Sequence, residues 1–145
     1  MQNAQQQNPV QAGGPPAVPP VVISPPPLQQ WQQDANNLNL DAEERELHRI
    51  LCHTHNFTRS QYTTLREEGY GTIHELRNWK HKEINTLLTN LSNRPINRGG
   101  QRYGDRRIKQ LQALAWFVNN SYARGLPVDL VLYEADPDRY ILNAA

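Results

Sequence analysis

Three short segments of this chain begin with the same helix-start signal, and that repetition limits the fold more than any other feature. The signal is an Asp or Thr followed three residues later by Glu or Gln. This is the spacing of a capping box, in which each of the two side chains binds the other residue's backbone N–H. The three pairs are Asp41 with Glu44, Thr58 with Gln61, and Thr72 with Glu75. We therefore predict a chain of short helices that begin at these positions.

Apolar residues recur at helical spacing behind each signal and in two later segments. Residues three and four positions apart lie on one face of a helix, so such a stripe predicts a helix with one buried face. The predicted helices cover residues 41–55, 58–69, 72–78, 80–92 and 105–125. Asp105 is expected to cap the last and longest of them, and Gly69 and Gly125 are expected to follow two helix ends in the left-handed conformation.

Five helices joined by short turns predict an all-α fold, a compact five-helix bundle over residues 37–125. Its aromatic residues fall on apolar faces and are expected in the core. Trp116 and Phe117 are neighbours that point about 100° apart on a helix, so one of them is expected at the bundle edge, where it could serve an interface. Residues 126–145 form an extension whose "DLVLYEA" fits a short helix or a strand. This extension either packs on the bundle or swaps onto a neighbouring copy.

The N-terminal segment has a different composition. Residues 1–33 hold eight of the eleven prolines, nine glutamines and no charged residue. Proline lacks a backbone donor and interrupts helices and central strands, so we predict that residues 1–36 are a disordered Pro/Gln-rich tail with polyproline II character. Such a tail is either a flexible spacer or a segment that docks on an aromatic-lined groove. Trp31 is expected to anchor it to the domain or to a partner.

Positive charge is concentrated in one stretch before the last helix. The whole chain has 15 basic and 14 acidic residues, but residues 94–109 carry six basic residues against one acidic residue, a local charge of 6 − 1 = +5. The stretch contains Arg94, Arg98, Arg102, Arg106, Arg107 and Lys109, with Tyr103 among them. Cations and glycines before a helix N-terminus suit anion binding, and Tyr103 could stack on a base. The other interpretation is a solvated turn whose arginines balance acidic residues elsewhere.

No sequence motif indicates catalysis. The chain lacks the nucleophile elbow, the P-loop, the zinc-protease helix and the dinucleotide fingerprint, and its carboxylates are scattered over polar helix faces. We therefore expect no enzyme, no catalytic residue, no cofactor and no small-molecule substrate. His48 and Cys52 lie one helical turn apart, near His53 and His55, but no second ligand pair follows, so we expect no metal site.

The beginning of the sequence has no secretory signal, and no apolar run is long enough to cross a membrane. Cys52 is the only cysteine, which excludes an intramolecular disulfide and fits a reducing compartment. We therefore expect a soluble intracellular protein, in the cytoplasm or the nucleus, that does not bind membranes.

The order of "LREEGYGTIHEL", "KEINTLLTNL" and "GGQRYGDRRIKQLQAL" resembles the SAM-like group of five-helix domains and the related helix-hairpin-helix modules. In SAM domains a glycine and basic residues commonly precede and open the final helix, a pattern that Gly104, Arg106, Arg107 and Lys109 fill. The "EGYG" turn is a poor phosphate loop because acidic residues precede it. The arrangement is also similar to gag-like N-terminal regions of some retroelements, which implies self-assembly and nucleic-acid packaging.

Two functions follow from these features. The first is a non-catalytic interaction or self-assembly module whose partner is another copy or another helical domain. The basic start of the last helix would dock head-to-tail on an acidic mid-domain surface around Glu67, Glu68 and Glu75, and such a contact builds rings or filaments. The alternative is a nucleic-acid-binding protein that uses the same basic stretch on RNA or DNA.

Overall fold

Every regular element in the described part of the chain is helical. The computed structural model describes residues 26–94 and 102–143, and within these ranges it contains no strand. The elements are α1 (Gln30–Asn37), α2 (Ala42–His48), the π-helix η1 (Arg49–Thr54), α3 (Arg59–Glu67), the 3₁₀ turn η2 (His74–Leu76), α4 (His81–Ser92), α5 (Asp105–Ala123), α6 (Leu130–Ala135) and α7 (Pro137–Asn143). The predicted all-α bundle is therefore confirmed.

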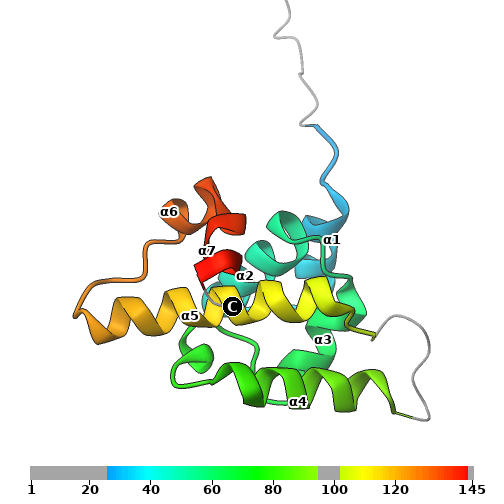
Figure 1. The fold of residues 1–145 in the computed structure, drawn as a ribbon. Coiled ribbons are helices and arrows are strands. Elements are labelled where there is room, and N and C mark those ends of the chain that lie inside the picture. Colours follow the sequence, from blue (N-terminus) through cyan, green and yellow to red (C-terminus); the bar gives the residue numbers. More distant parts are fainter. Residues whose placement is uncertain (1–25, 95–101, 144–145) are drawn as a thin grey trace, which may run out of the picture.

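Helix α5 is the longest element and organises the others (Figure 1). Helix α4 lies along one side of α5 and runs in the opposite direction. Helices α6 and α7 lie on another side, where Asp138 and Tyr140 of α7 reach Arg106 and Phe117 of α5. Helices α1, α2 and α3 gather near the other end of α5. Both faces of α5 are therefore covered along much of its length, which explains why its apolar residues extend beyond a single stripe.

The capping boxes form as predicted. Asp41 Oδ1 accepts a hydrogen bond from Glu44 N at 2.8 Å, and Thr58 Oγ1 accepts one from Gln61 N at 3.1 Å. In both boxes the Glu or Gln side chain accepts the N-cap residue's own N–H. Each box therefore satisfies two backbone donors that a helix start leaves without partners.

Two glycines also adopt the predicted conformation. Gly69 has φ +95° after α3 and Gly125 has φ +67° after α5. Three asparagines share this left-handed region, which asparagine enters more readily than other non-glycine residues. They are Asn39, Asn56 and Asn78, and each lies in a turn between two elements.

The helix inventory differs from the prediction in four places. Helix α1 covers Gln30–Asn37, so residues 30–36 of the predicted tail are helical; residues 1–25 lie outside the described residues. Ala35 is buried there, and its burial supplies the apolar contact that a polar segment lacks on its own.

Within residues 72–78 the only helical element is the 3₁₀ turn η2, His74–Leu76. The N-cap of α5 is Gly104, so Asp105 is its first residue. Finally, α6 and α7 follow the five predicted helices.

The C-terminal extension contacts the bundle of this single chain, and "DLVLYEA" is helical. The Tyr133 hydroxyl lies 2.6 Å from His55 Nε2, and both residues are buried. The ring of Tyr140 packs edge-on against Phe117 of α5 at 4.9 Å. Glu134 pairs with Arg49 and accepts a hydrogen bond from Thr54 at 3.1 Å. These contacts join α6 and α7 to both η1 and α5.

The core contains side chains from nearly all of these elements. Its largest fully buried members are Leu47, Ile50, Leu51, Tyr62, Leu65, Leu76, Ile84, Leu88, Leu91, Leu111, Leu114 and Tyr133. Of the adjacent aromatics on α5, Phe117 is buried and Trp116 is only partly so, which confirms that one of the two lies at the bundle edge. Trp31 packs against the domain, with its ring centroid 4.9 Å from that of His53.

Candidate interaction site

The start of α5 carries three exposed cations from the predicted basic stretch. Arg102, Arg106 and Lys109 are exposed, whereas Arg98 lies outside the described residues. Arg106 reaches Asp138 only at 3.9 Å, and both side chains are at least 70 % exposed, so this ion pair adds little to stability. We call Arg102, Arg106 and Lys109 the α5-start cations. They are free to meet an external group because the fold makes little use of their charges.

Two other arginines of the stretch are occupied within the chain. Arg94 donates to Glu68 at 2.9 Å. Arg107 donates to the backbone oxygen of Asn56 at 3.2 Å, and its guanidinium lies 5.6 Å from the centroid of the Phe57 ring. Burial, together with the nearby Arg106, lowers the pKa of Arg107. Both side chains help hold the turn regions against the bundle, so they are poorer candidates for an external contact than sequence reasoning indicated.

Tyr103 is a core residue, and this corrects the prediction that its ring could stack on a base. Its exposed fraction is 5 %, and its hydroxyl donates to the backbone oxygen of Gln61 at 2.6 Å. Burial raises the pKa of this phenol. The Gln61 side chain in turn donates to the backbone oxygen of Arg102 at 2.6 Å, which fixes the chain just before α5. Tyr103 therefore positions the start of α5 instead of contacting a ligand.

The three carboxylates predicted to form the acidic surface have different roles. Glu67 is exposed, and no ion pair among the described residues involves it. Glu68 is the partner of Arg94. One Glu75 oxygen accepts hydrogen bonds from the backbone of Gly71 and Thr72, at 2.9 and 3.0 Å. Glu67 is therefore the carboxylate with the most freedom to meet a partner.

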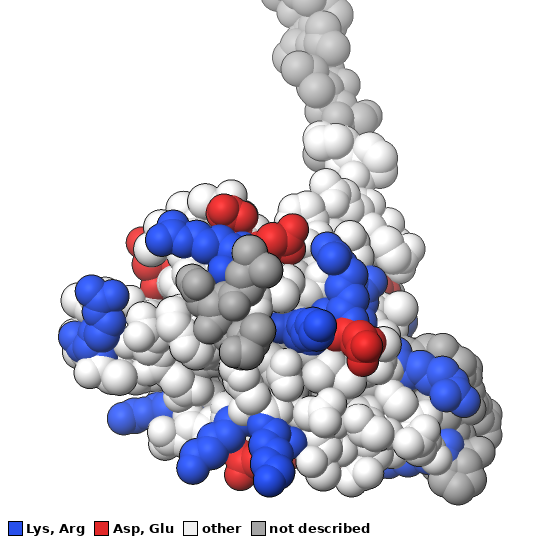
Figure 2. All heavy atoms as spheres, in the orientation of Figure 1, with Lys and Arg blue, Asp and Glu red and all other residues white. Residues whose placement is uncertain are grey.

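The distribution of charge over the surface is mixed. Figure 2 shows Lys and Arg side chains spread over the displayed face, with Asp and Glu side chains between several of them. A mixed surface of this kind suits local, geometrically specific ion pairs better than a long-range field.

Two members of the histidine and cysteine cluster, His48 and His55, are buried, whereas Cys52 is half-buried and His53 is exposed. His48 is fully buried, packs edge-on against Tyr62 at 4.8 Å, and has a pKa lowered by burial. Burial raises the pKa of the Cys52 thiol to about 12, so this thiol is a poor nucleophile. No group of three or more metal-binding side chains occurs in residues 26–94 and 102–143.

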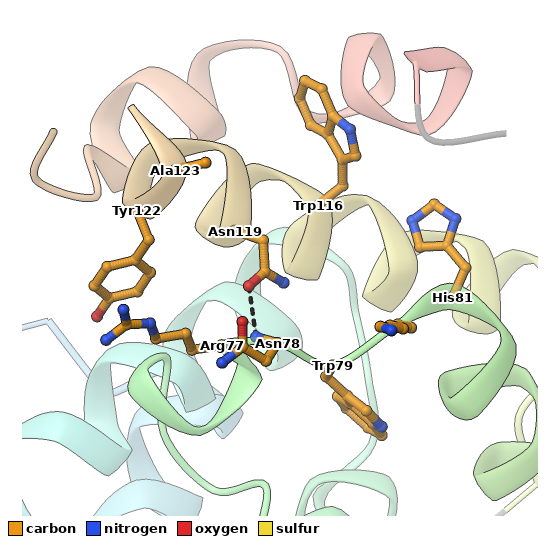
Figure 3. Close-up of a pocket in the computed structure, with 9 residues that line it drawn as sticks. Arg77, Asn78, Trp79, His81, Trp116, Asn119, Tyr122 and Ala123 are labelled. Atoms are coloured by element: carbon orange, nitrogen blue, oxygen red, sulfur yellow. Dashed lines mark hydrogen bonds between the residues drawn. The ribbon is translucent and has the colours of Figure 1, made fainter. Parts of the chain in front are cut away.

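An open groove lies between α5 and the turn that leads from η2 into α4 (Figure 3). Its volume is about 770 Å³, and its lining includes Arg77, Asn78, Lys80, His81, Trp116 and Tyr122. We call it the aromatic–basic groove. Sequence reasoning missed it because its two walls, which meet at Asn78 and Asn119, are 41 residues apart in sequence. Only the expectation of an edge aromatic at Trp116 or Phe117 pointed toward it.

The walls of the aromatic–basic groove are fixed by the fold. Asn119 accepts a hydrogen bond from the backbone N–H of Asn78 at 2.5 Å (Figure 3). The Asn119 side chain also donates to the backbone oxygen of Leu76 at 3.2 Å. The left-handed conformation of Asn78, with φ +66°, turns the chain between these two contacts. The Arg77 guanidinium lies over the Tyr122 ring at 4.5 Å from its centroid.

No helix within the described ranges is long and apolar enough to cross a membrane. No protein-family model matches the chain, and no curated protein or solved structure is significantly similar to it.

Proposed function

We propose that this chain is a non-catalytic interaction module that associates with another copy, or with another helical domain, through the α5-start cations. The observation that carries the proposal is that Arg102, Arg106 and Lys109 are exposed and almost unpaired beside a well-ordered helix start. A rigid element presents charges to a partner at little entropic cost, because the backbone is already ordered. Gln61 and Tyr103 supply that rigidity.

The acidic half of the proposed contact is the surface around Glu67, Glu68 and Glu75 of the partner. Glu67 is its principal member, because Arg94 already neutralises Glu68 and Glu75 holds its own turn. The cations lie at the start of α5 and Glu67 is the last residue of α3, so a contact that joins the two across copies is heterologous and propagates from copy to copy. Exposed charge pairs contribute more to partner choice and association rate than to affinity, so we expect reversible, salt-sensitive assembly.

A charge-swap experiment tests this contact directly. We expect Arg106→Glu and Glu67→Lys each to reduce the mass measured by light scattering, because each places like charges opposite each other. Mixing the two variants should restore association, since the carboxylate introduced in one variant then faces the ammonium introduced in the other. Arg124→Glu, just after the far end of α5, is the matched control and should assemble like the wild type. If both variants assemble normally, or if the mixture does not recover, the head-to-tail contact is wrong.

The same experiment separates the nucleic-acid alternative. The light-scattering measurements are repeated after nuclease treatment and removal of bound polynucleotide by high salt. Association that persists without polynucleotide supports the protein contact. Association that requires added RNA or DNA, and is lost in Arg106→Glu, would assign the α5-start cations to phosphate contacts instead.

A further inference from the structure

The aromatic–basic groove combines basic side chains with an available aromatic ring. Arg77, Lys80 and His81 contribute to its lining, and no Asp or Glu is among the lining residues. No ion pair within the described ranges involves Arg77 or Lys80. Cations that share a hollow repel each other unless an anion enters it, so the charge of this groove favours an anionic occupant.

The aromatic side chains narrow the choice among anions. Trp116 is partly exposed, and its nearest ring neighbour is Tyr140, at 6.2 Å and tilted by 34°. The Arg77 guanidinium lies over the Tyr122 ring, 4.5 Å from its centroid. A guanidinium that lies over an aromatic ring still has N–H groups that can donate to an oxyanion. In Figure 3, Arg77 and Tyr122 lie at one end of the groove, and Trp116 and His81 lie toward the other. The groove thus offers donors for an anion at its Arg77 end and a stacking surface at its Trp116 end.

We propose that the aromatic–basic groove binds single-stranded nucleic acid, with an unpaired base against Trp116 and the adjoining phosphates on Arg77 and Lys80. Binding without sequence preference to single strands uses this combination of cations that follow the backbone and aromatic rings that stack on bases. Paired bases in a duplex are not available to such a ring. An acidic peptide would satisfy the cations but would leave Trp116 without a stacking partner. This site is separate from the proposed protein contact at the α5 start.

The experiment uses the full chain, freed of polynucleotide, and a fluorescein-labelled oligothymidylate of about 12 nucleotides. Fluorescence anisotropy should show binding of the oligothymidylate. The logarithm of the association constant should fall with the logarithm of the salt concentration at a slope of about −1.4, which corresponds to two phosphate contacts on a single strand. Arg77→Gln combined with Lys80→Gln should abolish most of this slope. Trp116→Ala should weaken binding roughly 5- to 150-fold and leave the slope unchanged.

Matched controls keep the result interpretable. Arg106→Gln combined with Lys109→Gln removes the same number of cations from the α5 start and should bind oligothymidylate like the wild type. A duplex of the same length and a polyglutamate peptide should both bind at least tenfold more weakly. Circular dichroism checks folding, and the exposed Arg77 and Lys80 provide variants that leave the core intact even if Trp116→Ala unfolds.

Three outcomes would overturn the assignment. The first is absence of oligothymidylate binding at low salt. The second is equal loss of binding in the α5-start control, which would place the nucleic acid at that site. The third is polyglutamate binding as tight as oligothymidylate binding together with an unaffected Trp116 variant, which would make the groove a site for acidic peptides. The first and third outcomes leave the charge-swap result untouched, so the groove can fail while the self-association contact stands. The second outcome would place the nucleic acid on the α5-start cations, and the charge-swap measurements after removal of polynucleotide then decide separately whether those cations also join two copies.

Discussion

Replacing His55 with glutamine should remove a pH-dependent component of stability that can be calculated from the structure. His55 is 3 % exposed, and its Nε2 lies 2.6 Å from the Tyr133 hydroxyl beneath the C-terminal helices. Burial lowers the pKa of this imidazole from 6.5 to about 4; Asp138 opposes the change, and Arg107 and Arg106 add to it. The folded state therefore holds His55 neutral at pH values where the unfolded chain is already protonated.

The size and sign of the effect follow from linkage. Between pH 4 and pH 6.5 the unfolded state binds more protons than the folded state, so the free energy of unfolding rises with pH across this window. At about 1.4 kcal/mol per pH unit, the full effect is about 3 kcal/mol. About 2.5 kcal/mol of it is lost on going from pH 7.5 to pH 4.5. His48, whose pKa is also lowered by burial, acts in the same direction.

Urea unfolding followed by circular dichroism, at several pH values from 4.5 to 7.5, measures this component. Carboxylates and His48 titrate in both proteins, so the difference between wild type and His55→Gln isolates His55. We expect the wild type to lose about 2.5 kcal/mol more than the variant over this range. Equal losses in the two proteins would show that His55 is not held neutral, and the buried contact between η1 and α6 would then be wrong.

Three further substitutions probe local features. Asp41→Ala removes the capping box of α2 and should lower the free energy of unfolding, measured in urea titrations, by about 0.5–2 kcal/mol. A smaller loss would mean that the box is not formed in solution. Gly69→Ala places a side chain at φ +95° with no other atom close to it. The strained backbone conformation should lower the free energy of unfolding by about 1–2 kcal/mol and lower the thermal midpoint. An unchanged midpoint would contradict this conformation. Tyr103→Phe removes a buried hydroxyl that donates to Gln61, so it should lower the free energy of unfolding by about 1–3 kcal/mol and leave the affinity for oligothymidylate unchanged. A reduced affinity would show that Tyr103 contacts the ligand.

Local signals predicted the helices well because their physical causes are local. Asp41 and Thr58 cap helices through atoms three residues away, and Gly69 ends one through its own backbone freedom. Helix α1 was missed for the complementary reason. The sequence of α1 is polar and follows a proline-rich segment. Its packing depends on residues that come later in the chain, such as His53, which contacts Trp31.

The site was less predictable because its geometry depends on distant partners. The basic stretch was recognisable from composition, but composition does not show that Arg94 pairs with Glu68, 26 residues earlier, or that Arg107 binds the backbone of Asn56. Because Tyr103 lies among arginines, the sequence allows its ring to stack on a base, whereas its hydroxyl donates to the backbone of Gln61, 42 residues away, in the core. The aromatic–basic groove likewise exists only where two separate segments meet.

The attachment of α6 and α7 to η1 has a consequence for how the chain is made. His55 and Tyr133 are 78 residues apart in sequence, and Thr54 and Glu134 are 80 apart. A nascent chain released only as far as residue 125 would leave Phe117 and His55 uncovered, because their covering groups have not yet been synthesised. Contacts of such long range also close late in folding. Completion of the domain during translation therefore waits for the last two helices to leave the ribosome, and a chain cut before them would be prone to aggregate.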